Sequence, residues 1–163
     1  MLGRAASGLG ALQCRVVSSE AAQVAVAYEA RGVQGVLAPG QTGHGPDPAH
    51  PRVSRWDDRI SIDLGHVDEL TRFAVMVRST GGTLVTTTAT DARIDVELGG
   101  EGLDLALTGH VVHGCLVLRA EGRTLSGSLR DATTAYGYDD VAWAAPDTPL
   151  PPHHTHPHEG ISR

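Results

Sequence analysis

The sequence predicts an all-β protein whose fold is an antiparallel β-sandwich of about seven to eight short strands. Apolar residues make up 40% of the chain but aromatic residues only 4%, so the core must be built mainly from Val, Leu, Ile and Ala. These residues repeatedly alternate with polar ones, which is the pattern of strands with one buried face. Turn signals recur at close intervals between the alternating segments, and no convincing amphipathic helix interrupts them.

The first part of the chain is expected to contain two strands after a start without pattern. Residues 1–14 are small and show no periodicity, so we expect a flexible N-terminus followed by a single domain over residues 15–145. Short apolar runs at residues 24–28 and 33–37 predict the first two strands. A chain of 163 residues is long enough for one such domain with a hydrophobic core.

Residues 38–55 are expected to form a long loop. The segment carries four prolines and three glycines in eighteen residues, a density that excludes a helix and a central strand. Loops of this length inside compact domains are either functional or disordered insertions.

Clear alternation begins after this loop and predicts the remaining strands. They are expected in the segments RISIDL (59–64), RFAVMVRS (72–79), TLVTTT (83–88), RIDVEL (93–98), GLDLALTG (102–109) and CLVLRAEGRTLSGSLRD (115–131). The glycine-rich residues 99–102 and the residues 120–123 predict two hairpin turns, the second using Gly122 for a positive φ. The short segment VDEL (67–70) is expected to form one helical turn.

The last part of the chain, residues 146–163, is expected to be a disordered tail rich in proline and histidine. It has five prolines among eighteen residues and no periodicity. Four histidines in it have spacings that could chelate zinc, nickel or copper: His153, His154, His156 and His158. The alternative is a disordered end in which the histidines are incidental.

Charge and cysteine content restrict the class of partner. The net charge is −6, and the thirteen basic residues, all arginine, form no cluster, so we expect no nucleic-acid partner. Two cysteines, Cys14 and Cys115, are no disulfide framework, which favours a reducing, cytoplasmic location. No apolar segment approaches the roughly 20 residues that a membrane helix needs, so no membrane association is expected.

Three segments together resemble one known family. WDDRISIDLGHVDELTRFAVMVRS (56–79) is similar to the part of TerD domains, a tellurium-resistance and stress-response family, in which an acidic loop ending in Asp-Asp precedes a strand, a short turn and another strand. TDARIDVELGG (90–100) resembles a later family strand. GCLVLRAEGRTLSGSLRDATTAYGYDDV (114–141) resembles the closing segment, with its Gly137-Tyr138 pair. The resemblance covers about residues 55–140.

The resemblance implies a non-catalytic interaction module that binds protein partners and holds calcium. In the family, an N-terminal Asp-rich motif and the acidic loop bind the ion together. Here nothing Asp-rich lies between residues 15 and 40, and only Asp57 and Asp58 keep the acidic pair. Calcium requires six to eight oxygen ligands. We therefore expect these two residues to be the remnant of an ion-binding loop, in a solvated turn screened by Arg55 and Arg59, with calcium binding degenerate or lost.

Other functional hypotheses depend on the histidines and on further acidic residues. His110, His113 and Cys115 offer two imidazoles and a thiol, but alternation puts His110 on the opposite face of a strand, and a zinc site needs a further ligand. The acidic pair Asp139-Asp140 could complete an oxygen site only if it lay beside residue 57. Asp131 and Asp147 could join it there.

Two further classes of protein stay open. One is a cupin-type small β-barrel enzyme or metal-binding protein with inward-facing histidines. The other is an assembly module with exposed strand edges. The sequence has no phosphate-binding loop, no Gly-x-Ser-x-Gly elbow and no His-Glu-x-x-His pair, so we expect no enzyme.

Overall fold

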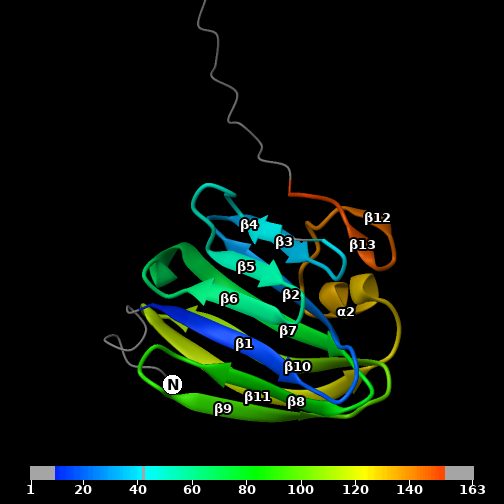
Figure 1. Cartoon of the computed structure of the whole chain (residues 1–163). Coiled ribbons are helices and arrows are strands. Elements are labelled where there is room, and N and C mark those ends of the chain that lie inside the picture. The colour runs from blue at the N-terminus through cyan, green and yellow to red at the C-terminus, as the bar shows by residue number, and fades with distance from the viewer. Residues whose placement is uncertain (1–9, 42, 153–163) are drawn as a thin grey trace, which may run out of the picture.

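The computed structural model describes residues 10–41 and 43–152 as two antiparallel sheets packed face to face, which confirms the predicted antiparallel sandwich (Figure 1). The described residues contain thirteen strands, more than expected, because several are short edge or hairpin strands. The two sheets do not close into a barrel, whereas the cupin-type alternative requires a closed barrel. No helix in the described part of the chain is long and apolar enough to span a membrane.

The first sheet has six strands in the order β4-β5-β6-β1-β8-β9. Its strands are β1 (Ala11–Val17), β4 (Gly43–Gly45), β5 (Val53–Trp56), β6 (Arg59–Asp63), β8 (Gly82–Thr87) and β9 (Arg93–Leu98). Strand β1, at the start of the chain, lies inside the sheet and pairs with both β6 and β8.

The second sheet has five strands in the order β11-β10-β7-β2-β3. Its strands are β2 (Gln23–Ala30), β3 (Val33–Leu37), β7 (Leu70–Arg78), β10 (Leu103–Val112) and β11 (Cys115–Leu125). The remaining elements are the 3-10 helix η1 (Val67–Glu69), the helix α2 (Leu129–Ala135) and a small hairpin of β12 (Trp143–Ala145) and β13 (Thr148–Pro149). Strands β2 and β3 and the helical turn η1 confirm the corresponding predictions.

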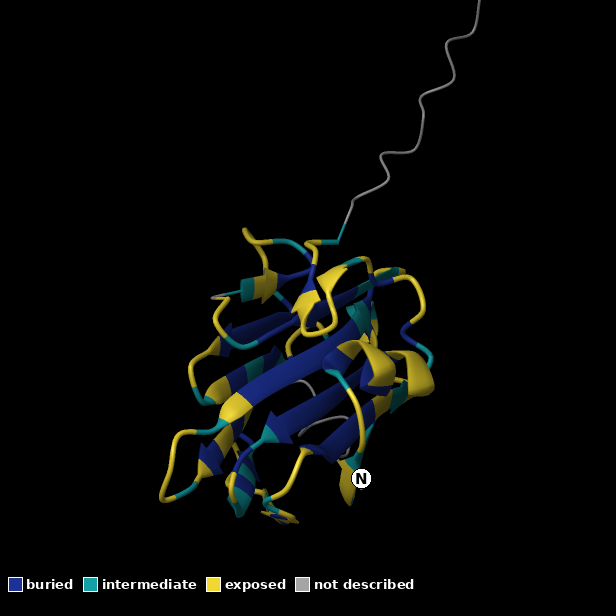
Figure 2. Ribbon diagram, turned by 90° about the vertical axis from the view of Figure 1, so that its right-hand side faces the viewer, coloured by how far each residue is buried: buried dark blue, intermediate teal, exposed yellow. Residues whose placement is uncertain are grey.

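The main core lies between the two sheets and is filled by aliphatic side chains at alternate strand positions. Ile60 and Ile62 of β6 are fully buried, whereas Arg59 is exposed. A second core covers the outer face of the five-stranded sheet. There Leu129, Ala132 and Tyr138 pack in one cluster with residues of β2 and β7, namely Ala25, Ala27, Ala74 and Met76. In Figure 2 the central strands are largely dark blue, which marks buried residues, whereas many turns and the outer side of the helix are yellow, which marks exposed residues.

The borders of the predicted domain differ from the observed ones at both ends and in the long loop. Strand β1 begins at Ala11, so the folded part starts before residue 15. The segment 38–55 contains β4 and β5, which pair at the edge of the six-stranded sheet. Residues 146–152 are ordered, because β13 pairs with β12 and Asp147 forms an ion pair with Arg78. The proline-rich segment 38–55 can still contribute β4 and β5 because it lies at the edge of the six-stranded sheet, where proline is tolerated.

Both predicted hairpins after residue 90 are wrong. The turn at 99–102 joins β9 of one sheet to β10 of the other, so it is a crossing between sheets. Strand β11 continues through Gly122, whose φ of 53° lies at a register shift opposite residues 105–107 of β10. The positive φ thus serves a β-bulge instead of a turn.

Helix α2 replaces the last expected strand. Its start carries a capping box, in which the Ser128 hydroxyl accepts a bond from the Asp131 main-chain N–H and the Asp131 carboxylate accepts one from the Ser128 N–H. The spacing Ser-x-x-Asp is a helix-start signal. The predicted strand over residues 115–131 is therefore wrong at its end, where the chain forms this helix.

Candidate functional site

The predicted site residues Asp57 and Asp58 form the two-residue turn between β5 and β6. Trp56 and Arg59 are paired directly on either side of the turn. Asp57 has a φ of 41°, a left-handed conformation that aspartate tolerates better than most residues. The turn is therefore a regular hairpin connection, and the two carboxylates need no ion to explain their presence in it.

Asp58 is held by two arginines on the surface. Its carboxylate lies 3.6 Å from Arg15 Nε and 3.7 Å from Arg59 Nε. All three side chains are well exposed, so these ion pairs contribute little to stability. The expected screening of the turn involves Arg59, but the second arginine is Arg15 from β1 and not Arg55.

Arg55 is instead buried beneath the turn, and only 5% of its surface is exposed. Its register partners are Ile60 on β6 and, beyond it, Cys14 on β1, both buried in the core between the sheets. An arginine at such a position requires hydrogen bonds for its guanidinium, because an unpaired buried charge is very unfavourable.

Three main-chain oxygens surround the Arg55 guanidinium. Nε donates to Val24 O at 2.6 Å, Nη1 donates to Gln41 O at 2.8 Å, and Nη2 donates to Asp57 O at 3.1 Å. These bonds link the start of β2, the loop after β3 and the β5–β6 turn. Burial lowers the pKa of Arg55 below its ordinary value, while the negative charge of Asp57 acts in the opposite direction.

The residues around the turn do not fit a calcium ion. Main-chain oxygens that converge from three segments are ligands that calcium could use, but here each accepts a hydrogen bond from Arg55. Within residues 10–41 and 43–152, no three His, Cys, Asp or Glu side chains are grouped so that they could hold a metal. The positive charge at this position is thus supplied by the chain itself. We call the guanidinium and its three carbonyl acceptors the Arg55 cage.

A cleft of about 510 Å³ opens next to the Arg55 cage. Its walls come from the loop between β1 and β2, from Pro39 and Gly40, and from Arg15, Asp57 and Asp58. Glu20 also lines it and accepts a hydrogen bond from Thr80 at 3.0 Å. The cleft therefore mixes both signs of charge and offers no single electrostatic preference.

The other acidic candidates have structural roles in the closing part of the chain. Asp131 belongs to the capping box of α2. Asp147 Oδ1 accepts a bond from Leu129 N at 2.7 Å, also at the helix start. The main-chain N–H of Asp140 donates to Gln34 Oε1 at 3.1 Å. These contacts fix the helix and the segment after it against the five-stranded sheet.

Arg72 of β7 is a second arginine that sequence reasoning missed. It donates to Glu29 at 2.9 Å and to the main-chain oxygens of Tyr136 and Gly137 at 2.9 and 2.6 Å. Its guanidinium also lies 4.4 Å from the centre of the Tyr138 ring, a cation–π contact. Arg72 thereby anchors the C-terminal end of α2, where carbonyl oxygens lack helical partners.

The candidates His110, His113 and Cys115 lie in different parts of the β10–β11 hairpin. His113 has a φ of 52° and lies in the turn, so strand alternation does not apply to it. His110 is inside β10, paired with Arg72 and Val117. Cys115 begins β11 and is half-buried. The four histidines of the tail, His153, His154, His156 and His158, lie outside the described residues.

The two thiols are expected to differ strongly in reactivity. Burial raises the pKa of the Cys14 thiol to about 12, although a hydrogen bond from Thr86 lowers it slightly. With Ellman's reagent at pH 8, the native chain should release one equivalent rapidly, from the half-buried Cys115, and a second only after unfolding. Cys115→Ser should abolish the rapid release. Two rapid equivalents in the native chain would contradict the buried position of Cys14.

Comparison with known proteins adds no assignment, since no family model, no curated protein and no solved structure matches this chain.

Proposed function

We propose that this chain is a non-catalytic domain similar to TerD domains, which acts as a protein-interaction module in a stress-response or tellurium-resistance setting and whose calcium binding is lost. The resemblance of residues 55–140 supports the class of module, and the sandwich fold agrees with it. Protein partners and a cytoplasmic location belong to the same proposal.

The Arg55 cage is the observation that carries the proposal. A guanidinium is a permanent cation, and it lies directly beneath the acidic pair where the resemblance implies a calcium ion. A divalent ion entering the cage would have to displace this charge. The module would then keep its shape without metal, and its binding to partners would not depend on calcium concentration.

Thermal unfolding in chelator and in calcium tests this proposal. A site with a Kd of about 10 μM, filled at about 1 mM calcium, would stabilise the fold by about 2.7 kcal/mol, which is a rise in Tm of roughly 5–10 °C. We expect the full chain to melt at the same temperature in both conditions. The double variant Asp57→Ala/Asp58→Ala should likewise melt at one temperature in chelator and in calcium, because neither exposed or half-exposed carboxylate is expected to hold the ion.

A calcium-specific rise in Tm that disappears in the double variant would contradict the proposal. Zinc added separately serves as the control for the tail histidines. A zinc response that leaves the calcium result unchanged would concern the tail and not the sandwich.

A further inference from the structure

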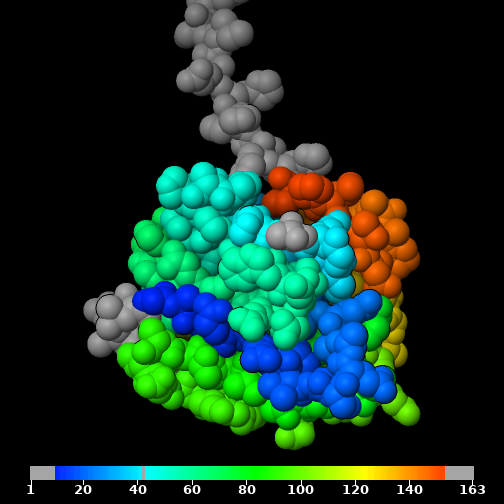
Figure 3. All heavy atoms as spheres, viewed as in Figure 1, coloured from blue at the N-terminus to red at the C-terminus, as the bar shows by residue number. Residues whose placement is uncertain are grey.

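The outer face of the six-stranded sheet differs from that of the five-stranded sheet because its outward positions remain exposed. On β1, the outward residues Gln13, Arg15 and Val17 are all exposed. In Figure 3 this face is turned toward the viewer, with β1 as a blue band between the residues of β6 and those of β8 and β9. By contrast, α2 and the closing segment cover much of the outer face of the five-stranded sheet.

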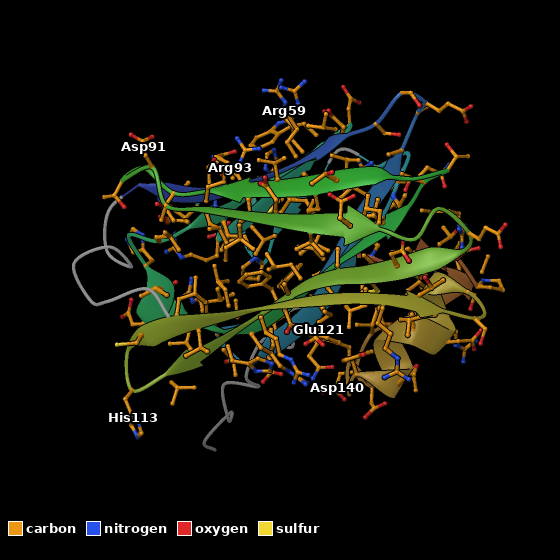
Figure 4. The ribbon with its side chains drawn as sticks, turned by 90° about the horizontal axis from the view of Figure 1, so that it is seen from below. Arg59, Asp91, Arg93, His113, Glu121 and Asp140 are labelled. Carbon is orange, nitrogen blue, oxygen red and sulfur yellow. The ribbon has the colours of Figure 1, made fainter. Side chains whose placement is uncertain are left out.

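Three arginines gather on this exposed face: Arg15, Arg59 and Arg93. With Gln13, Val17, Val85 and Thr87 they line a hollow of about 510 Å³. Figure 4 shows Arg59 and Arg93 on the side of the molecule away from Glu121 and Asp140. We call this surface the arginine face. Although the chain has a net charge of −6, the lining of this hollow carries three arginines and no acidic side chain.

Two of the three arginines are arranged unfavourably for the isolated chain. Arg15 and Arg59 are direct cross-strand partners on β1 and β6, and like charges opposite each other destabilise a sheet. They share one carboxylate, Asp58, at 3.6 and 3.7 Å, which is longer than a hydrogen bond. Side chains that are 58% exposed can turn their N–H groups toward a further anion.

Apolar side chains adjoin the arginines on the same face. Trp56 is 44% exposed and pairs with Arg59 across the β5–β6 hairpin, and Val17 is 53% exposed at the end of β1. Exposed tryptophan and arginine are the residues that most often dominate protein–protein binding energy. The surface thus combines carboxylate-binding groups with apolar contact area.

The charge pattern favours an acidic peptide over a nucleic acid. Arginine can bind carboxylates through paired N–H donors, and Arg93 already donates one hydrogen bond, from Nε, to Asp95 Oδ1 at 2.7 Å. Asp58 and Asp95 are ion-paired with these arginines, so a backbone with closely spaced phosphates would meet negative charge as well. A peptide with separated carboxylates and apolar residues has no such conflict.

We propose that the arginine face binds an acidic peptide segment of a partner protein, with Arg15 and Arg59 contacting its carboxylates and Trp56 and Val17 its apolar side chains. This inference rests on the proposed function as an interaction module and names the chemistry of the partner.

Fluorescence polarisation with a labelled peptide of repeated Asp-Leu-Ser units, in which the carboxylates are separated, tests the inference. The full chain should bind it at low salt, and binding should weaken as salt rises. Arg15→Gln/Arg59→Gln should lower the affinity about tenfold or more. The matched control is Arg119→Gln/Arg123→Gln, which removes two exposed charges from β11 of the other sheet; it should change the affinity less than about twofold.

Three results would overturn the inference: absence of binding to the wild-type chain, an equal loss in both double variants, or tighter binding of a single-stranded oligonucleotide than of the peptide at the same salt. None of these results would alter the melting temperature in calcium, so failure of this inference is distinguishable from failure of the proposed function.

Discussion

Gly35→Ala is expected to lower the free energy of unfolding by about 3 kcal/mol, because the added methyl group would overlap a buried ring. A Cβ at this position of β3 would overlap the hydroxyl oxygen of Tyr28 and would lie 2.5 Å from the ring carbon that carries it. Tyr28 is completely buried, and Gly45 approaches the same hydroxyl from another strand. The ring cannot move away, so Tm should fall by roughly 10 °C.

Gly65→Ala is the matched control for this prediction. Its added Cβ would meet only the end of the Asp63 side chain, at 3.2 Å, on an exposed turn, and we expect a change of less than about 0.5 kcal/mol. In a Tyr28→Leu background, Gly35→Ala should cost clearly less than in the wild type, because the two changes couple through the ring. Equal costs in both backgrounds would show that the ring is not the cause.

Arg55→Met is expected to lower the free energy of unfolding by about 2–4 kcal/mol. The methionine side chain can fill much of the space, but it leaves Val24 O, Gln41 O and Asp57 O without their donor. Chemical denaturation of the two chains measures the difference. The slope of the free energy with denaturant should stay the same, since the sandwich itself is retained.

Arg59→Met is the control, because it removes the same charge from the surface two residues after Asp57. It should change stability by less than about 0.5 kcal/mol. If both variants lost the same stability, the effect would come from net charge and not from the Arg55 cage.

Alternation made much of the fold predictable. Segments such as 59–64 and 72–79 carry a buried face that only a strand satisfies, and they were expected where β6 and β7 occur. The pattern does not state which strands pair, and so it could not distinguish a hairpin at residues 99–102 from a crossing between sheets. Strand pairing depends on contacts distant in sequence, which local pattern does not contain.

The candidate site was predictable only in position. The acidic pair Asp57 and Asp58 was predicted at a turn, where it is found, but Arg55 was expected to screen that turn in solvent and is buried instead. Val53 and Arg55 have the same parity on β5, so an inward Val53 places the arginine inward as well. The prolines of residues 38–55 conceal this signal, because their density predicts a loop. Two of the three main-chain oxygens that accept hydrogen bonds from Arg55 belong to β2 and to the loop after β3. These segments lie next to Arg55 only in the folded chain.

The central place of β1 has a consequence for the order in which this molecule can be assembled. The strand is completed at residue 17, yet its neighbours β6 and β8 end at residues 63 and 87. Strands β2 and β3 can pair locally as soon as they are synthesised, whereas β1 must stay unpaired until β6 is complete, about 46 residues later, and its other edge until β8 is complete, about 70 residues later. During translation, Leu12, Cys14 and Val16 would be exposed throughout this interval. For the nascent chain, this is the segment that most needs protection from aggregation.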